Sequence, residues 1–169
     1  MILKLNKEKV FKPIFRILGV ILLVFVFFLI YAGVAGFIEY LPALLLIISI
    51  PVIPTAYLFI EYFIVTRNQT VEITSEFISI KYEDGKSSYY QKNELEVVKL
   101  YKSKMAEKGH FNFSTIQTFY HAEIFTKSGE RLILTSFLGP NFDEALDLLK
   151  SIRKDVKRSI FSSIYFKLF

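Results

Sequence analysis

Few residues in this chain of 169 are of the types that carry out chemistry. Cysteine is absent, which excludes disulfides, thiolate metal ligands and a cysteine nucleophile. His121 and Glu123 lie two residues apart, on one face of an expected strand, where they form either a general base with its orienting carboxylate or a solvated surface contact. We favour the surface contact. His110 adjoins a loop and has no metal-binding partner near it in sequence.

No catalytic or phosphate-binding motif accompanies these residues. The chain has no glycine-rich phosphate loop, no G-x-S-x-G and no H-E-x-x-H. The sequence therefore predicts a protein that is not an enzyme and that has no catalytic residue, no cofactor and no metal site.

Basic residues suggest contacts of another kind. Lys99, Lys102, Lys104 and Lys108 form a patch that either meets acidic partners or protects a strand edge, and we favour the edge. The net charge is +5, without a block of positive charge like that of a nucleic-acid-binding protein. We therefore expect no nucleic acid among the partners.

Two apolar runs, residues 17–38 and 40–60, must position everything else. Only Glu39 separates them, and each is long enough for the roughly 30 Å of a bilayer core. We expect a transmembrane helical hairpin that turns at residues 36–42, with Pro42 in the first turn of the second helix. Pro51 and Pro54 indicate a kink, which serves either as a gate or merely as a bend, and the bend is the interpretation we favour.

The flanking charges predict the orientation of this hairpin. Basic residues precede the first run and Arg67 follows the second, whereas the turn has no lysine or arginine. The positive-inside rule then places both termini in the cytoplasm. The expected location is the inner or plasma membrane, which the chain crosses with two spans.

From Arg67 onward the pattern becomes that of short strands. Alternation predicts strands at 70–74, 77–82, 87–91, 94–103, 110–117, 119–126 and 131–137, with a bulge at Val97-Val98 and a hairpin turn at Asp84-Gly85. Asn141 then reads as the N-cap of a helix. Its predicted apolar stripe consists of Phe142, Ala145, Leu146, Leu149, Ile152 and Val156.

This order of elements resembles that of bacterial PH-like membrane proteins, including the YcxB-like and related bacterial PH-domain families. The resemblance covers roughly residues 17–159 and rests on V-E-I-T…F-I-S-I-K-Y-E-D-G and on L-I-L-T-S-F…F-D-E-A-L-D-L-L-K-S-I. It implies a membrane α-helical hairpin plus an α+β cytoplasmic domain, a PH-like antiparallel β-barrel or sandwich capped by a C-terminal helix. The loop Ser75-Glu76 lacks the basic residues with which eukaryotic PH domains bind phosphoinositides, so the resemblance implies no such pocket.

We accordingly divide the chain into a basic cytoplasmic N-terminus (1–16), a hairpin (17–66), a PH-like domain (67–159) and an amphipathic aromatic tail (160–169). The expected function is a small integral membrane protein that presents a binding domain for a protein or a lipid surface. The alternative is a structural or regulatory subunit of a larger membrane complex, packed through the hairpin. The expected partners are the bilayer, an unknown protein, anionic lipid headgroups and a second copy of the chain.

The tail is predicted to continue the helix and to lie at the membrane interface. Basic and aromatic residues near the two ends of the chain and the end of the hairpin are the candidate membrane-surface contacts. They are Lys9, Lys12, Arg16, Arg67, Arg153, Lys157, Arg158, Phe161, Tyr165 and Phe169.

Overall fold

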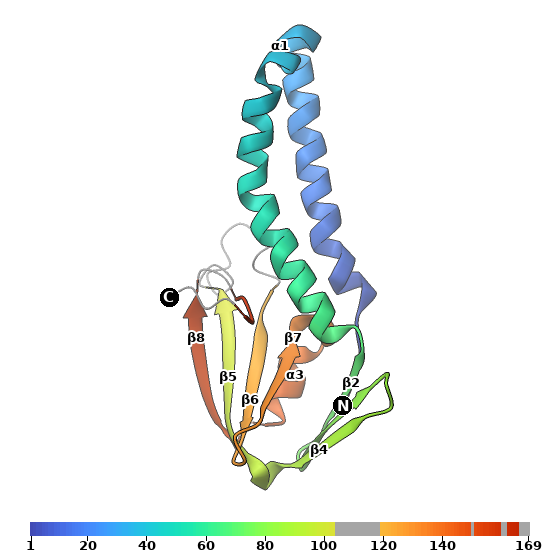
Figure 1. Ribbon diagram of the computed structural model, residues 1–169, viewed down its shortest axis with the longest axis vertical. Helices are drawn as coiled ribbons and strands as arrows, with labels where there is room; N and C mark the ends of the chain where they lie inside the picture. The colour runs from blue at the N-terminus through green and yellow to red at the C-terminus, as the bar shows by residue number, and fades with distance from the viewer. Residues whose placement is uncertain (104–118, 150, 160–161, 166–169) are drawn as a thin grey trace.

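A long helical projection rises from one end of two β-sheets in the computed structural model of the chain (Figure 1). The structure describes residues 1–103, 119–149, 151–159 and 162–165. The projection is α1 (Lys7–Thr66). Asn6 caps it, because the Asn6 side chain accepts a hydrogen bond of 3.1 Å from the Lys9 N–H.

Helix α1 is bent sharply at one residue. Gly33 has φ 66° and ψ 179°, outside the helical region and readily accessible only to glycine. The parts before and after it, which we call the first arm (7–32) and the second arm (34–66), lie side by side in Figure 1. The rings of Phe25 and Phe37 meet edge to face across the bend, with centroids 5.7 Å apart.

The structure records one helix, α1, in place of the two that were predicted, and the predicted turn at residues 36–42 is wrong. Helical structure continues through Glu39 and Pro42, and the break lies earlier, at Gly33. We placed the turn at a charge and a proline, whereas the backbone bends where a glycine allows a positive φ. In the described part of the chain one helix, α1 itself near the N-terminus, is long and apolar enough to cross a membrane by length and composition.

The first sheet joins the chain on both sides of α1. It consists of β1 (Ile2–Leu3), β2 (Gln69–Ile73), β3 (Phe77–Tyr82) and β4 (Ser87–Gln91), in that order and all antiparallel. Ile2 pairs with Glu72, so residues just before and just after α1 are neighbours in one sheet. The predicted strands and the Asp84-Gly85 turn are confirmed, with Gly85 at φ 84°. Strand β1 was not predicted, because two residues are too short to show alternation.

The second sheet follows through η1 (Lys92–Glu94). It contains β5 (Leu95–Ser103), β6 (His121–Thr126), β7 (Arg131–Thr135) and β8 (Arg153–Ser159), in the order β7-β6-β5-β8. The pairing shifts register between Leu95 and Val97, next to the predicted bulge. Strand β7 leads into η3 (Ser136–Leu138). The predicted strand at 110–117 lies outside the described residues.

The predicted C-terminal helix is only partly right. Helix α3 (Phe142–Asp147) ends early, and residues predicted to continue it form β8, which pairs in parallel with β5 from Val97–Arg153 to Ser103–Ser159. Leu149 and Ile152 are buried as predicted, but Val156 is 46% exposed. Backbone pairing along the free edge of β5 outweighs the helical spacing of the side chains.

The core lies between the two sheets and α3. It includes Val71, Ile80, Leu100, Ile124 and Leu134, all at most 3% exposed. The arrangement is consistent with the predicted antiparallel sandwich, with β8 as a parallel addition and the short α3 in place of the long helix.

Candidate functional site

The candidate site lies where α1 meets the sandwich. Six buried apolar residues from distant parts of the chain form what we call the junction cluster: Val10, Leu58, Tyr62, Phe119, Phe137 and Ile164. The Tyr62 ring meets Phe119 and Phe137 edge to face, with centroids 5.4 and 5.7 Å apart. The junction cluster fixes the last turns of α1 on η3 and on Phe119, two residues before β6.

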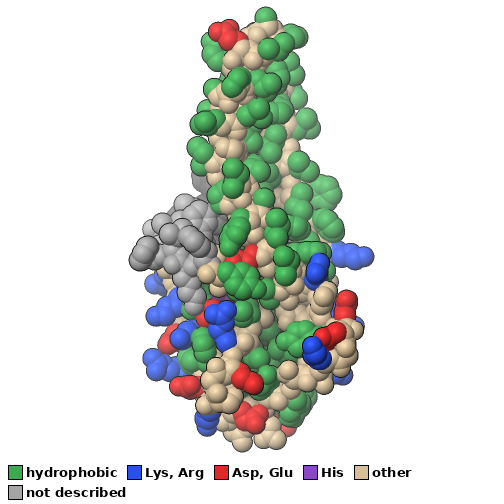
Figure 2. All heavy atoms as spheres, viewed as in Figure 1, with side chains coloured by type: hydrophobic (Ala, Val, Ile, Leu, Met, Phe, Trp, Pro, Cys, Tyr) green, Lys and Arg blue, Asp and Glu red, His purple; other side chains and the backbone are tan. Residues whose placement is uncertain are grey.

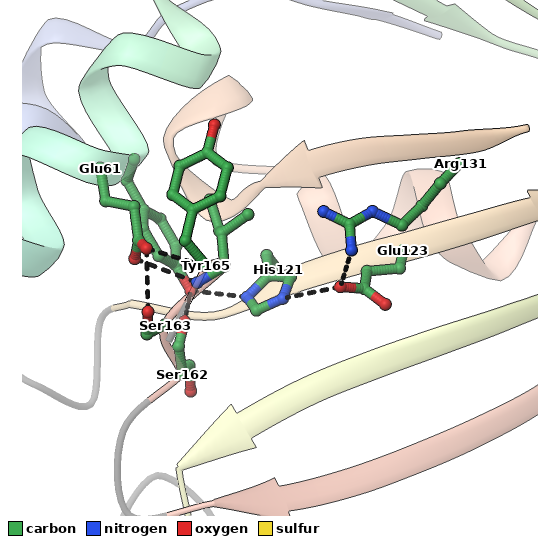
Figure 3. Close-up of polar contacts among 9 residues, drawn as sticks. Glu61, His121, Glu123, Arg131, Ser162, Ser163 and Tyr165 are labelled. Atoms are coloured by element: carbon green, nitrogen blue, oxygen red, sulfur yellow. Dashed lines mark hydrogen bonds and ion pairs between the residues drawn. The ribbon is translucent and has the colours of Figure 1, made fainter. Parts of the chain in front are cut away.

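A polar network runs beside the junction cluster (Figure 3). The Tyr62 hydroxyl lies 2.9 Å from His121 Nδ1 and donates to the Ser162 carbonyl at 2.6 Å. The His121 ring also stacks on Tyr101, with centroids 4.7 Å apart. Because Tyr62 and His121 are fully buried, these contacts tie α1 to the second sheet in a region shielded from water.

His121 and Glu123 do share one strand face, but the predicted solvated contact is wrong. Both side chains are 0% exposed, with His121 Nε2 3.9 Å from Glu123 Oε1. Arg131 Nη1 lies 3.5 Å from the same oxygen, which compensates the buried carboxylate. Neither residue lines either of the two cavities described below. This burial suits a structural pair, and the prediction that the chain is not an enzyme stays a prediction.

Glu61 is a second buried carboxylate, and sequence reasoning missed its role. Its side chain accepts hydrogen bonds from Ser163 Oγ (2.8 Å), the Ile164 N–H (3.0 Å) and the Tyr165 N–H (2.9 Å). Glu61 is only 4% exposed. A buried charge is tolerated when several donors satisfy it, and here the donors come from the C-terminal segment. The signal in the sequence was a lone glutamate at the end of an apolar helix.

The tail therefore differs from its prediction wherever it is described. Ser162, Ser163 and Ile164 are buried, and residues 162–165 are not helical. In the predicted amphipathic helix these two polar side chains would be exposed. Their burial follows from the Glu61 and Tyr62 contacts, which hold this segment against α1.

The predicted membrane-surface residues are spread over several elements. Lys12, Arg16 and Arg67 are exposed, while Lys9 is half-buried near the Pro140 carbonyl. Tyr165 is 65% exposed beside the junction cluster, and Phe161 and Phe169 lie outside the described residues. These contacts stay predictions.

The three predicted membrane-surface residues of β8 do not lie at one level. Arg153, Lys157 and Arg158 are exposed along the strand, whose C-terminal end points toward α1 (Figure 1). Five residues of strand separate Arg153 from Arg158, about 16 Å. Arg158 is therefore much closer to the helical projection than Arg153.

The predicted lysine patch is engaged within the domain. Lys99 Nζ lies 4.3 Å from the centroid of the Phe125 ring. Lys102 Nζ lies 3.1 Å from Asp143 Oδ1, and the Tyr120 hydroxyl donates to the same carboxylate at 2.9 Å. Burial, and secondarily the Asp143 charge, raises the pKa of Tyr120 well above its ordinary value. Lys104 and Lys108 lie outside the described residues.

Two cavities flank the sandwich. One, of about 550 Å³, is open to solvent at the end away from α1, and its lining mixes Lys92, Lys127 and Arg153 with Glu76 and Glu96. The other, of about 320 Å³, is apolar and lies between the arms of α1. Among the described residues no group of three or more histidine and acidic side chains is placed to hold a metal ion.

Comparison with known proteins supports the fold. A PH-domain family model matches residues 3–143, most of the chain. The protein belongs to this PH-domain family. No curated protein and no solved structure matches it. The matched region includes all of α1 and strands β2 to β7, and it ends before β8.

Proposed function

We propose that this protein is a membrane-anchored PH-like binding module, in which the two arms of α1 cross the bilayer and the sandwich faces the cytoplasm. The match to a PH-domain family suggests a binding module. The family match establishes the PH domain alone. Our proposal adds that the domain is presented at a membrane and that the chain is related to the bacterial YcxB-like branch.

The observation that carries this proposal is the apolar surface of α1. Side chains such as Leu23, Ile30 and Leu46 are 66–80% exposed, and Figure 2 shows hydrophobic side chains covering the projection while lysine and arginine gather on the sandwich. So large an exposed apolar surface is unfavourable in water and favourable in hydrocarbon.

The pairing of β1 with β2 supports two crossings. A straight helix of 60 residues would separate its ends by about 90 Å, yet Ile2 and Glu72 are paired neighbours. If α1 enters the bilayer, it must return to the side from which it entered. The basic residues Lys12 and Arg16 near its start favour the cytoplasm as that side.

The partner of the sandwich is a protein or the lipid surface. The alternative function, a structural or regulatory subunit of a larger complex, is favoured by the same exposed arms, because apolar helices also pack against other membrane helices.

Extraction and sizing test the proposal. The full chain should stay in the membrane pellet after alkaline carbonate treatment and should elute from a sizing column in mild detergent as a discrete small oligomer. Release by carbonate would overturn membrane insertion. Co-purification with a larger assembly would favour the alternative.

A further inference from the structure

The cavity between the arms of α1 has the character of a binding site. It measures about 320 Å³ and is lined by Ile17 and Ile21 of the first arm, Val52 and Phe59 of the second arm, and Phe119 at the sandwich end. Pro51 and Pro54 lie in the second arm beside Val52, and prolines inside a helix bend it. The two arms therefore leave space between them here instead of packing closely.

The lining excludes a polar ligand. Thr55 is the single polar residue among the lining side chains that the structure describes, and its hydroxyl donates to the Pro51 carbonyl at 2.7 Å. A polar molecule that entered would lose its hydrogen bonds to water without replacing them, which is unfavourable.

The size excludes a helix as the occupant. One turn of α-helix, with a diameter of about 10 Å and a pitch of 5.4 Å, fills roughly 420 Å³, which is more than the cavity holds. A partner helix or a second copy of the chain would cover the arms without filling the space. A slender flexible molecule fits better, since the volume is at the lower end of small-molecule sites.

The mouth of the cavity opens on the apolar surface of the arms. Leu18 and Ile60 line the cavity and are also 55% and 56% exposed. If the arms lie in the bilayer, this mouth faces lipid hydrocarbon, and an acyl chain can enter from the side. An empty apolar cavity would forfeit the packing contacts that such a chain supplies.

We propose that the cavity is a binding site for one acyl chain of a membrane lipid. This inference rests on the proposed insertion of α1 in the membrane. The bound acyl chain would end against Phe119, whose ring packs on Tyr62 and Phe137. Occupancy of the cavity would therefore affect the packing of the junction cluster, which joins α1 to the sandwich.

Adjacent residues of the second arm provide a matched test. Val52 lines the cavity, whereas Ile53 does not and is 65% exposed. Val52→Phe should fill the cavity, and Ile53→Phe should add a ring on the outer surface only. Ala56→Phe, at another lining position, is a second blocking variant in case Val52→Phe fails to fold.

Each full-length protein is reconstituted in phosphatidylcholine–phosphatidylglycerol vesicles, extracted in mild detergent and weighed by native mass spectrometry. Wild type and Ile53→Phe should retain one lipid molecule, and the blocking variants should lose it. A photoreactive acyl-chain lipid should label Ile17, Ile21 or Phe59 in wild type, in a manner that unlabelled lipid saturates.

Equal retention by all folded variants, or none by wild type, would overturn the inference. Unsaturable labelling spread evenly over exposed positions such as Leu46 would do the same. Carbonate extraction separates this failure from failure of the proposed function. A chain that resists carbonate but retains no lipid refutes the acyl-chain site alone, and a chain that carbonate releases refutes both.

Discussion

At the scale of single residues, Glu61 and Tyr62 are consecutive in α1 and both hold the C-terminal segment. Glu61 accepts hydrogen bonds from two backbone N–H groups and a hydroxyl, and Tyr62 donates to the Ser162 carbonyl. A carboxylate that satisfies several buried donors cannot be removed without leaving those donors unpaired. These two side chains therefore connect the end of α1 with a segment a hundred residues away in sequence.

Replacement of Glu61 should release the tail. Glu61→Ala should cost about 1–3 kcal/mol for each buried donor that loses its acceptor. Hydrogen exchange of the full chain in detergent, followed by mass spectrometry, should show faster exchange at residues 162–165, with a smaller effect for Glu61→Gln. Glu39→Ala, which removes an exposed carboxylate from the same helix, is the control. Unchanged protection in Glu61→Ala would contradict the assignment.

Removal of the Tyr62 hydroxyl should weaken the junction without creating a large cavity. Tyr62→Phe keeps the ring contacts with Phe119 and Phe137 but loses the bonds to His121 and Ser162. The expected loss is about 1–3 kcal/mol, because buried partners remain. Denaturant midpoints of the full chain in detergent measure it, and Tyr89→Phe, at a 58% exposed position, should have almost no effect. Equal midpoints for the two variants would show that the hydroxyl contributes nothing.

Tyr120 should make stability sensitive to alkali. Burial and the Asp143 charge raise the pKa of Tyr120 in the folded state. The contribution of Tyr120 to folding stability is therefore fully present below the unfolded pKa of about 10 and is lost as the pH rises toward the folded pKa. Melting temperatures from pH 9 to 11 should fall more steeply for wild type than for Tyr120→Phe. Parallel curves would show that Tyr120 ionises equally in the folded and unfolded states.

At the scale of elements, the sequence predicted correctly those strands and turns that neighbouring residues along the chain determine. The strands at 77–82 and 87–91 and the turn at Asp84-Gly85 are as predicted, because alternation and a glycine with positive φ are visible in the sequence. Strand β8 was predicted as helix, since its pairing with β5 is a tertiary contact that no spacing reveals. The Glu61 site was missed for the same reason, because its donors lie a hundred residues away.

The buried part of the predicted helix stripe gives a test of the packing just after α3. Leu149 is 2% exposed and belongs to the sandwich core, whereas neighbouring Leu148 is 38% exposed. Leu149→Ala in the full chain should cost about 2–5 kcal/mol through lost burial and a residual cavity. Leu148→Ala, which removes the same atoms from the surface, should cost far less. Similar denaturation midpoints for the two variants would show that this turn does not close the core.

At the scale of the whole molecule, the sheet that contains β1 and β2 constrains how α1 can lie in a membrane. Both ends of the helix are attached to one sandwich, so they are on the same side of any bilayer that the arms enter. The basic residues that flank α1 then determine on which side of the bilayer both termini lie. An arrangement with one terminus on each side would require β1 to separate from β2.

The topology prediction follows from this constraint. A reporter active only outside the cytoplasm, fused after Phe169, should be inactive, and an N-terminal epitope should be inaccessible from outside intact cells. Lys12→Glu with Arg16→Glu alters exposed side chains near the start of α1 and should weaken the cytoplasmic preference. In the molecules that invert, the reporter and the epitope should change sides together. Lys81→Glu with Lys86→Glu changes the charge equally on the exposed surface of the sandwich and should leave the topology unchanged. An active reporter combined with a protected epitope would contradict the pairing of β1 with β2 in the membrane-bound protein.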